Sequence, residues 1–169
     1  MEALSTPAWR DACARRGRAI LHDSTGRFRV NSNGARHDVW LLYRCRGCGD
    51  TRKRRIAHRC LASELPCGAL APYLENDAAC ARRHAFELAP QEPLPYRVLR
   101  PEPAPAGVLH ARIHSPEPCG ERWDRFLARE LACSRGEVVR AAGSGALRLE
   151  GASALARPVQ DGQGFVWAR

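Results

Sequence analysis

The stretch RFRVNSNGARHDVWLLYRCRGCGD, residues 27–50, predicts a β-hairpin that runs directly into a pair of cysteines. Asn33 and Gly34 near its centre favour the positive φ values that a tight hairpin turn requires. The segment VWLLY at 39–43 is apolar at every position, which is typical of a central or covered strand. The fold expected for the N-terminal part of the chain is therefore built around this hairpin.

The first strand of the hairpin carries two kinds of side chain in alternation. Phe28 and Val30 alternate with Arg27 and Arg29. Successive side chains of a strand point to opposite faces of a sheet. We therefore expect one apolar face and one basic face.

The net charge of +9 comes from the first third of the chain. Residues 1–59 hold fourteen Arg or Lys against five Asp or Glu, whereas residues 60–169 hold thirteen of each. Lys53 is the only lysine, so the basic groups are nearly all guanidinium groups, which bind phosphate through paired hydrogen bonds and stack on bases. A genome rich in G and C would also favour Arg over Lys, but it would not cluster the charges. The clustering favours a nucleic acid as partner.

The composition favours a cytoplasmic protein. The N-terminus MEALSTPAWRDACARR lacks the apolar core of a signal peptide, and the apolar run at 39–43 is too short to span a membrane. In a reducing compartment the eight cysteines are expected to be thiols or metal ligands. Their even number leaves a secreted, disulfide-linked protein as the alternative.

Two short cysteine segments resemble the halves of one metal site. In CRGCG at 45–49, two thiolates two residues apart can hold one ion, and the glycines permit the tight turn beneath it. The matching segment CARRG at 13–17 has Arg16 where a zinc ribbon would have its fourth cysteine. A guanidinium group cannot ligate zinc, so the expected site lacks one ligand.

Three interpretations of these segments stay open. In the first, zinc is held by Cys13, Cys45 and Cys48 with a fourth ligand from elsewhere, for which the nearest candidates in sequence are His22, His58 and Cys60. In the second, the metal has been lost and Arg16 fills the gap in a ribbon that packing alone sustains. In the third, Cys45 and Cys48 are a redox pair. An open catalytic zinc would need a general base, and no glutamate motif lies nearby, so no catalytic residue is predicted.

The other cysteines are far from one another in sequence. Cys67, Cys80 and Cys133 are expected to be small buried residues that form no site. His84 and His110 are expected to be structural for the same reason.

Composition divides the chain into four regions and predicts an α+β protein. Residues 61–90 have a helical pattern that is interrupted at Asn76 and Asp77, where the second helix would be capped. Eight of the twelve prolines fall within 90–118, where only short strands are expected. The regions are a zinc-ribbon-like basic region at 1–60, a helical pair at 61–90, a proline-rich connection at 91–118 and a C-terminal domain at 119–169.

The C-terminal region predicts two helices followed by a small sheet. Trp123, Phe126 and Leu127 share one helical face, while three arginines at helical spacing form another. Ser134 begins a second helix with the capping-box pattern S-x-x-E, and Val138 and Val139 are its expected apolar positions. The segments ALRLEG at 146–151 and GFVWAR at 164–169 are expected strands.

The sequence RWDRFLARELACSRGEVVRAAGSGALRLEG at 122–151, with ARPVQDGQGFVWAR after it, resembles the RNA-binding domain named after ribosomal protein S-four. The resemblance rests on Arg122, Asp124, Leu127, Leu131, Ser134, Arg135, Gly145, Gly151 and Gly162. The sequence departs from the pattern at Trp123, at Cys133, at the reversed pair Asp161–Gly162 and at Glu150, whose carboxylate could repel phosphate.

This resemblance implies a set of RNA contacts on the two helices and the following strand. The expected contacts are Arg122, Arg125, Arg129, Ser134, Arg135, Arg140 and Arg148. Because this region is nearly neutral, the basic first third is expected to supply much of the nonspecific affinity.

The N-terminal half has a resemblance of its own. FRVNSNGARHDVWLLYRCRGCGDT at 28–51 is similar to a bacterial family catalogued as domain of unknown function 1062, in which a pair of cysteines precedes the hairpin and a second pair follows it. The similarity continues through NDAACARRHAFEL to about residue 90. Arg16 is the departure, and the family brings no activity with it.

These observations favour a non-enzymatic protein that contacts structured RNA, such as ribosomal RNA, and associates with ribosomes. The first alternative is a zinc-ribbon module for protein interaction or regulation, whose C-terminal domain no longer binds RNA. The second is a thiol or zinc enzyme.

Overall fold

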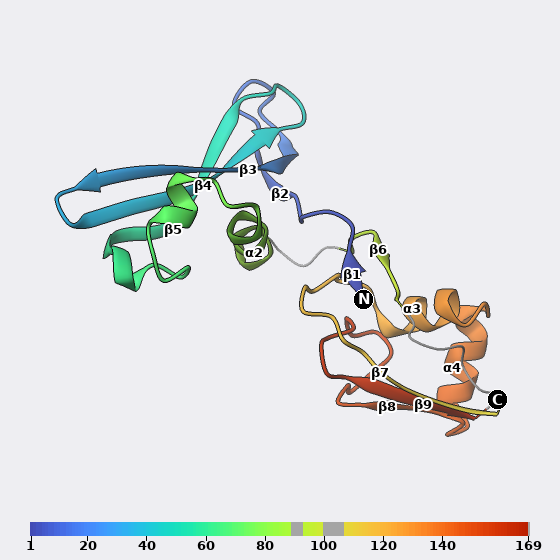
Figure 1. The fold of residues 1–169 in the computed structure, drawn as a ribbon. Helices are drawn as coiled ribbons and strands as arrows, with labels where there is room; N and C mark the ends of the chain where they lie inside the picture. The colour runs from blue at the N-terminus through green and yellow to red at the C-terminus, as the bar shows by residue number, and fades with distance from the viewer. Residues whose placement is uncertain (89–92, 100–106, 169) are drawn as a thin grey trace. The chain divides into compact units, whose positions relative to one another are not determined.

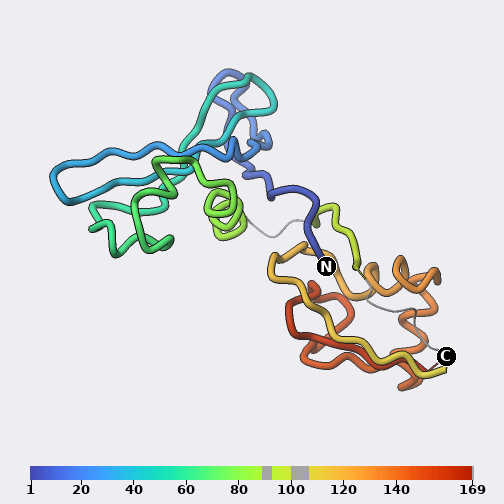
Figure 2. Tube along the Cα trace, viewed as in Figure 1, coloured from blue at the N-terminus to red at the C-terminus, as the bar shows by residue number. Residues whose placement is uncertain are grey.

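The computed structural model describes residues 1–88, 93–99 and 107–168. The chain forms two compact units. The N-terminal unit is Thr6–Pro90, and the C-terminal unit joins Met1–Ser5 to Gln91–Arg169. The fold is mixed α+β with more residues in strands than in helices. Figure 1 shows these elements, and Figure 2 traces the path of the chain in the same view. Within the described residues, no helix is long and apolar enough to cross a membrane.

The N-terminal unit is built on one antiparallel sheet. Its four strands lie in sequence order: β2 (Trp9–Ala12), β3 (Ala19–Asn33), β4 (Arg36–Cys45) and β5 (Thr51–Leu61). The predicted hairpin is confirmed as β3 and β4. Strand β5 was not predicted, because its run of basic residues hides the alternation that would identify a strand.

The hairpin turn forms where the sequence predicts it. Asn33 pairs with Arg36, and Gly34 has φ of 60°. Val39 and Leu41 are fully buried, which confirms β4 as a central strand. The pairing of β3 with β4 shifts register between Ser24 and Phe28, which bends the long strand β3.

Helices cover one face of this sheet. A short 3-10 turn, η1 (Ala62–Glu64), is followed by α1 (Ala71–Leu74) and α2 (Ala78–Leu88). Phe28, Val39, Leu41 and Tyr43 pack there against Tyr73, Ala81 and Ala85 to form the core. The predicted break between the helices is confirmed: Asn76 has φ of 57°, and Asp77 Oδ1 accepts a 2.7 Å hydrogen bond from the Cys80 amide.

The C-terminal unit contains two helices and a three-stranded antiparallel sheet. The sheet order is β7-β9-β8, and a two-stranded ribbon pairs β1 with β6. The elements are β1 (Glu2–Ala3), β6 (Tyr96–Arg97), β7 (Val108–Arg112), α3 (Trp123–Glu130), α4 (Arg135–Gly143), β8 (Leu147–Glu150) and β9 (Gly164–Ala168). Strands β6 and β7 both fall within the stretch 91–118 that the sequence presents as a connection.

The apolar face predicted for α3 forms the core of this unit. Trp123 and Leu127 are fully buried, and the Trp123 ring meets Phe165 edge-on at 6.0 Å. On α4, Val138 is fully buried as expected, but Val139 is 56% exposed. The prediction for Val139 was wrong because α4 buries only one narrow side, and the next residue points about 100° away from it.

Candidate functional site

Three cysteines meet at one end of the N-terminal sheet. Cys13 follows β2, Cys45 ends β4 and Cys48 lies in the turn before β5. Their sulfur atoms all lie within 4.8 Å of one another, and the Sγ atoms of Cys13 and Cys48 are 3.4 Å apart. The group as a whole could hold a metal ion, because clustered thiolates are ligands of soft and borderline metals.

The two matching cysteine segments form the same kind of turn. The amide of Gly17 donates to the carbonyl of Cys13, and that of Gly49 to the carbonyl of Cys45, each at 2.9 Å. Both glycines have positive φ, 62° and 77°. The equivalence that the two five-residue segments suggest is therefore present in the backbone, although one segment has an arginine in place of a cysteine.

The environment of the sulfurs distinguishes the three thiols. Burial alone would raise the pKa of Cys13, but hydrogen bonds from Cys48 and from the backbone of Arg15 and Arg16 hold this pKa below its ordinary value. A backbone hydrogen bond from Asp50 lowers the pKa of Cys48, yet burial and contact with the other two thiols raise it to about 11. Three crowded sulfurs cannot all carry charge without a cation between them.

None of the three candidates for a fourth ligand joins the cysteine group. His58 Nδ1 lies 2.6 Å from Asp38, and the Cys60 thiol contacts the carbonyl of His58. His22 comes nearest in the fold, because it pairs with Cys45 across β3 and β4. Its Nδ1 lies 3.0 Å from the carbonyl of Ile20, while its buried Nε2 has no hydrogen-bond partner among the described residues.

Arg16 lies beside the second cysteine turn. A Cβ atom built on Gly47 would be 3.5 Å from both Cδ and Nε of Arg16. The arginine that replaces the expected cysteine thus packs its stem and the start of its guanidinium group against the opposite turn. A Cβ atom at 47 would also lie 2.5 Å from Ile20 Cδ1, so a larger residue there would require the end of the Ile20 side chain to move.

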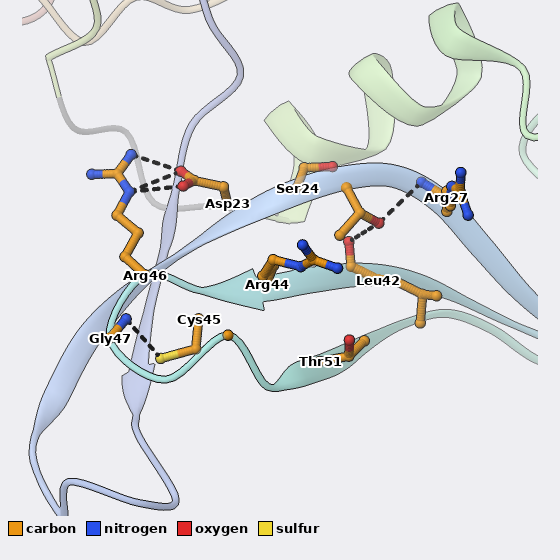
Figure 3. Close-up of a pocket in the computed structure, with 11 residues that line it drawn as sticks. Asp23, Ser24, Arg27, Leu42, Arg44, Cys45, Arg46, Gly47 and Thr51 are labelled. Atoms are coloured by element: carbon orange, nitrogen blue, oxygen red, sulfur yellow. Dashed lines mark hydrogen bonds and ion pairs between the residues drawn. The ribbon is translucent and has the colours of Figure 1, made fainter.

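A cleft of about 800 Å³ adjoins the cysteine group (Figure 3). Arginines from β3, β4 and the following turn line it, namely Arg27, Arg44 and Arg46. The single carboxylate of the lining, Asp23, accepts two hydrogen bonds from Arg46 Nε and one of 2.6 Å from its Nη2. The other two guanidinium groups have no ion-pair partner within the described residues.

The cleft opens onto the face of the sheet that the helices leave uncovered. Trp40 on β4 pairs with Arg29 on one side and with Arg55 on the other, and Leu42 pairs with Lys53. The Lys53 ammonium lies 4.6 Å from the centre of the Trp40 ring. Residues paired directly across strands share a face. We call this set the basic face; its exposed cations are Arg27, Arg29, Arg44, Lys53 and Arg55.

In the C-terminal unit, two predicted RNA contacts converge on a buried carboxylate. Asp124 accepts hydrogen bonds of 3.1 Å from Arg122 and of 2.5 and 3.1 Å from Arg135. Ser134, also a predicted contact, caps α4 and exchanges hydrogen bonds with Glu137. All three side chains therefore have partners within the fold, and the spacing of residues in the sequence does not reveal the two pairs made with Asp124.

The remaining predicted contacts are exposed. Arg129 stacks on the Tyr96 ring at 3.7 Å and pairs with Glu130. Three others make no side-chain hydrogen bond or ion pair with the described part of the chain: Arg125, Arg140 and Arg148. The acid that departs from the RNA-binding pattern, Glu150, lies 3.2 Å from His110 Nε2.

A second cysteine site corrects the expectation that Cys67 and Cys80 are isolated. They form a disulfide, and their sulfurs lie within 4.8 Å of a ring nitrogen of His84. Cys80 and His84 are one helical turn apart on α2, but only the folding of the loop over the helix brings Cys67 to them. The spacing of four between Cys80 and His84 was the one local signal in the sequence.

Comparison with known proteins identifies one family. The family model described as "Protein of unknown function (DUF1062)" matches residues 30–153. No curated protein and no solved structure matches the chain.

Proposed function

The chain belongs to the DUF1062 family, and we propose that it is a non-enzymatic protein that binds structured RNA through the basic face of its N-terminal sheet. The observation that carries this proposal is the concentration of five exposed cations on the uncovered side of β3, β4 and β5. Ribosomal RNA is the ligand to test first, and its binding would imply association with ribosomes.

The charges of the basic face are available to a polyanion. Two nearby carboxylates are already paired, Asp23 with Arg46 and Asp38 with His58, while a third, Asp11, lines a cleft together with Arg29 and Lys53. Each guanidinium group presents parallel donors that match phosphate oxygens. Structured RNA is recognised mainly through its shape and its backbone, which requires a cationic surface and no dense set of base contacts.

Aromatic and apolar side chains at the centre of the basic face support the same partner. Trp40 is 8% exposed and Leu42 is half-buried, so the cations lie over packed side chains of the sheet. Lys53 over the Trp40 ring is held close to the surface by the cation–π contact. An ordered sheet loses less backbone entropy when it binds phosphate than a flexible tail with the same charges would.

The C-terminal unit supplies a smaller contribution in this proposal. Arg125, Arg140 and Arg148 are the exposed cations that the resemblance to the S-four-type domain assigns to RNA. Arg122 and Arg135 would act indirectly, because their pairing with Asp124 joins the two helices.

The finer proposal for the cysteine group is a structural zinc site in a zinc-ribbon-like region. Cys13, Cys45 and Cys48 would hold the ion, and the donor set fits because three sulfurs already converge. We propose His22 as the fourth ligand: its ring does not join the three sulfurs as they stand, but its buried Nε2 lacks a partner among the described residues and its strand pairs with that of Cys45. Zinc would neutralise the thiolates and join the two turns.

The experiment that tests RNA binding compares two charge-matched variants. In the first, Arg29, Arg44 and Arg55 are changed to Gln on the basic face. In the control, the same change is made at exposed arginines elsewhere: Arg18, Arg112 and Arg157. Binding to a folded ribosomal RNA fragment is measured over a series of salt concentrations.

We expect the wild type to bind with a steep negative dependence of log K on log salt concentration. The basic-face variant should bind more weakly, with the magnitude of the slope reduced by about 1 for each phosphate that it no longer neutralises. The control variant should retain most of the slope. Equal binding by the two variants would contradict the proposal, and a lack of salt dependence would favour the protein-interaction function instead.

A further inference from the structure

We infer that Cys67 and Cys80 form a redox-active pair that undergoes thiol–disulfide exchange, with Cys67 as the sulfur that a partner dithiol attacks. The disulfide joins the loop after η1 to the first turn of α2. This inference is independent of the RNA-binding proposal, because the pair lies in the helical cover of the sheet rather than on the basic face.

The side chains around Cys67 favour its thiolate form. Nη2 of Arg83 lies 2.8 Å from the Cys67 sulfur. Reactive cysteines lie in electropositive, partly exposed surroundings, where a nearby guanidinium group stabilises the thiolate. Arg83 itself is only loosely tied to Glu87, at 3.8 Å, so much of its charge remains available to the sulfur.

A buried chain of hydrogen bonds fixes the position of Cys67. The Cys67 amide donates to the Tyr73 hydroxyl at 3.2 Å, and that hydroxyl lies 3.0 Å from His84 Nε2. His84 Nδ1 lies 2.6 Å from Glu87, so both ring nitrogens of His84 have a hydrogen-bond partner. These contacts do not depend on the disulfide, so we expect the loop to stay in place when the S–S bond opens.

The two sulfurs differ in access, which assigns their roles. Cys67 is partly exposed, and its neighbours Pro66, Gly68 and Ala69 are small and exposed. Cys80 is only 5% exposed. An incoming thiolate can therefore reach the sulfur of Cys67, and the sulfur of Cys80 is the leaving group.

The exchange balances with one dithiol as the reductant. One thiolate of the reductant attacks Cys67 Sγ; the S–S bond breaks, and its electron pair goes to Cys80 Sγ, which takes a proton from solvent. The second thiolate of the reductant then attacks the reductant's own sulfur in the mixed disulfide and releases Cys67 as a thiolate beside Arg83. The pair is reduced to two thiols, and the reductant is oxidised to a cyclic disulfide.

Cys80 is placed to act as that leaving group. It stands in the first turn of α2, an 11-residue helix, where the free amides of the helix N-terminus favour negative charge. The carboxylate of Asp77 caps the same turn and opposes this effect, so charge does not favour Cys80 over Cys67 as the leaving group, and it is the burial of Cys80 that directs attack to Cys67.

The test follows reduction of the full-length chain by dithiothreitol, with a chelator present to keep metals away from the thiols. Alkylation of samples over time, followed by peptide mass analysis, reports the Cys67–Cys80 pair separately from the six free cysteines. The same rate is measured at several urea concentrations below the unfolding transition. Oxidised dithiol is then added to test whether the bond forms again.

Two matched variants identify the role of the guanidinium group. Arg83→Gln removes the charge beside Cys67, and Arg82→Gln removes its neighbour, which lies over the Phe86 ring at 5.3 Å instead. We expect reduction that is nearly independent of urea, and a rate about three- to tenfold lower in Arg83→Gln than in Arg82→Gln. In addition, Cys80→Ser should react through Cys67 with an aromatic disulfide faster than Cys67→Ser reacts through Cys80.

Two results would overturn the inference. If reduction occurs only as urea unfolds the chain, the bond is an inert structural disulfide. If Arg83→Gln and Arg82→Gln react at the same rate and Cys67 is no more reactive than Cys80, the surroundings of the pair do not activate it. Both measurements remain valid when a variant is less stable. Each rate is compared at a urea concentration that lies equally far below the unfolding midpoint of that variant.

Discussion

Arg135 and Asp124 form a doubly hydrogen-bonded ion pair in which Nε and Nη2 both donate to the same carboxylate oxygen, at 3.1 and 2.5 Å. The pair links the start of α4 to α3 within the C-terminal unit. Asp124 is almost fully buried, whereas the Arg135 side chain is 55% exposed. Loss of the arginines would therefore leave a buried carboxylate without a partner, whereas loss of the carboxylate would leave Arg135 in contact with solvent.

Replacing Asp124 with Asn should destabilise the C-terminal unit by about 2 kcal/mol, because the buried group loses charge-assisted hydrogen bonds. Arg135→Gln should cost about 1 to 2 kcal/mol, since Arg122 still neutralises the carboxylate. The matched control is Arg125→Gln, which removes an exposed arginine from α3 and should leave the free energy of unfolding nearly unchanged. Amide exchange in α3, read by mass spectrometry, reports the unit separately. Equal effects of the two arginine changes would contradict this assignment.

The ion pair also predicts how stability depends on pH. Burial alone would raise the pKa of Asp124, but hydrogen bonds from Arg135 and the charge of Arg122 hold it below its usual value. A folded-state pKa below the unfolded one means that this carboxylate stabilises the fold above about pH 4 and loses its contribution as pH falls through the folded pKa. The difference in unfolding free energy between wild type and Asp124→Asn should therefore be constant from about pH 7 to about pH 5 and shrink below about pH 4. If the difference in unfolding free energy grew as the pH fell, the pKa of Asp124 would be raised on folding and not lowered.

The cysteine group should bind one zinc ion per chain once the protein is reduced and freed of metal. Cobalt substitution should give the strong absorption of thiolate ligation, which Cys48→Ser should weaken. His22→Gln should lower the affinity at least about tenfold if its ring joins the three sulfurs, while His58→Gln should have no effect. If the two histidine variants bound zinc with equal affinity, His22 would not be a ligand, and the fourth coordination position would be taken by solvent.

Reduction of the Cys67–Cys80 bond should lower the stability of the N-terminal unit without unfolding it. The bond closes a loop with a sequence separation of 13, for which chain entropy predicts a loss of about 3 kcal/mol. The measurement is urea unfolding with and without reductant, in a buffer that contains a chelator. The double variant Cys67→Ser/Cys80→Ser serves as the control, because the reductant should not change its unfolding midpoint.

Local patterns in the sequence predicted many of the elements but not the partners of the side chains. The turn at Gly34, the cap at Ser134 and the buried face around Trp123 depend on residues close in sequence, and all three are present. Strand β5 was missed because its basic residues alternate with other basic residues, so the period of two is visible only in the burial of the folded strand. Pairing of Arg135 with Asp124 could not be deduced from helical spacing, because the two lie on different helices.

Residues that are neighbours along the chain specify an α+β protein with a basic N-terminal hairpin, two equivalent cysteine turns and a capped helix before a small C-terminal sheet. Which polar groups meet is a property of the folded chain alone. Folding brings Cys13 to Cys45 and Cys48, joins Cys67 to Cys80, and places the cations of β3, β4 and β5 on one open face. The physical reason is that turns, caps and apolar periodicity arise from local interactions, whereas these contacts depend on strand register and on how the loops close over the core.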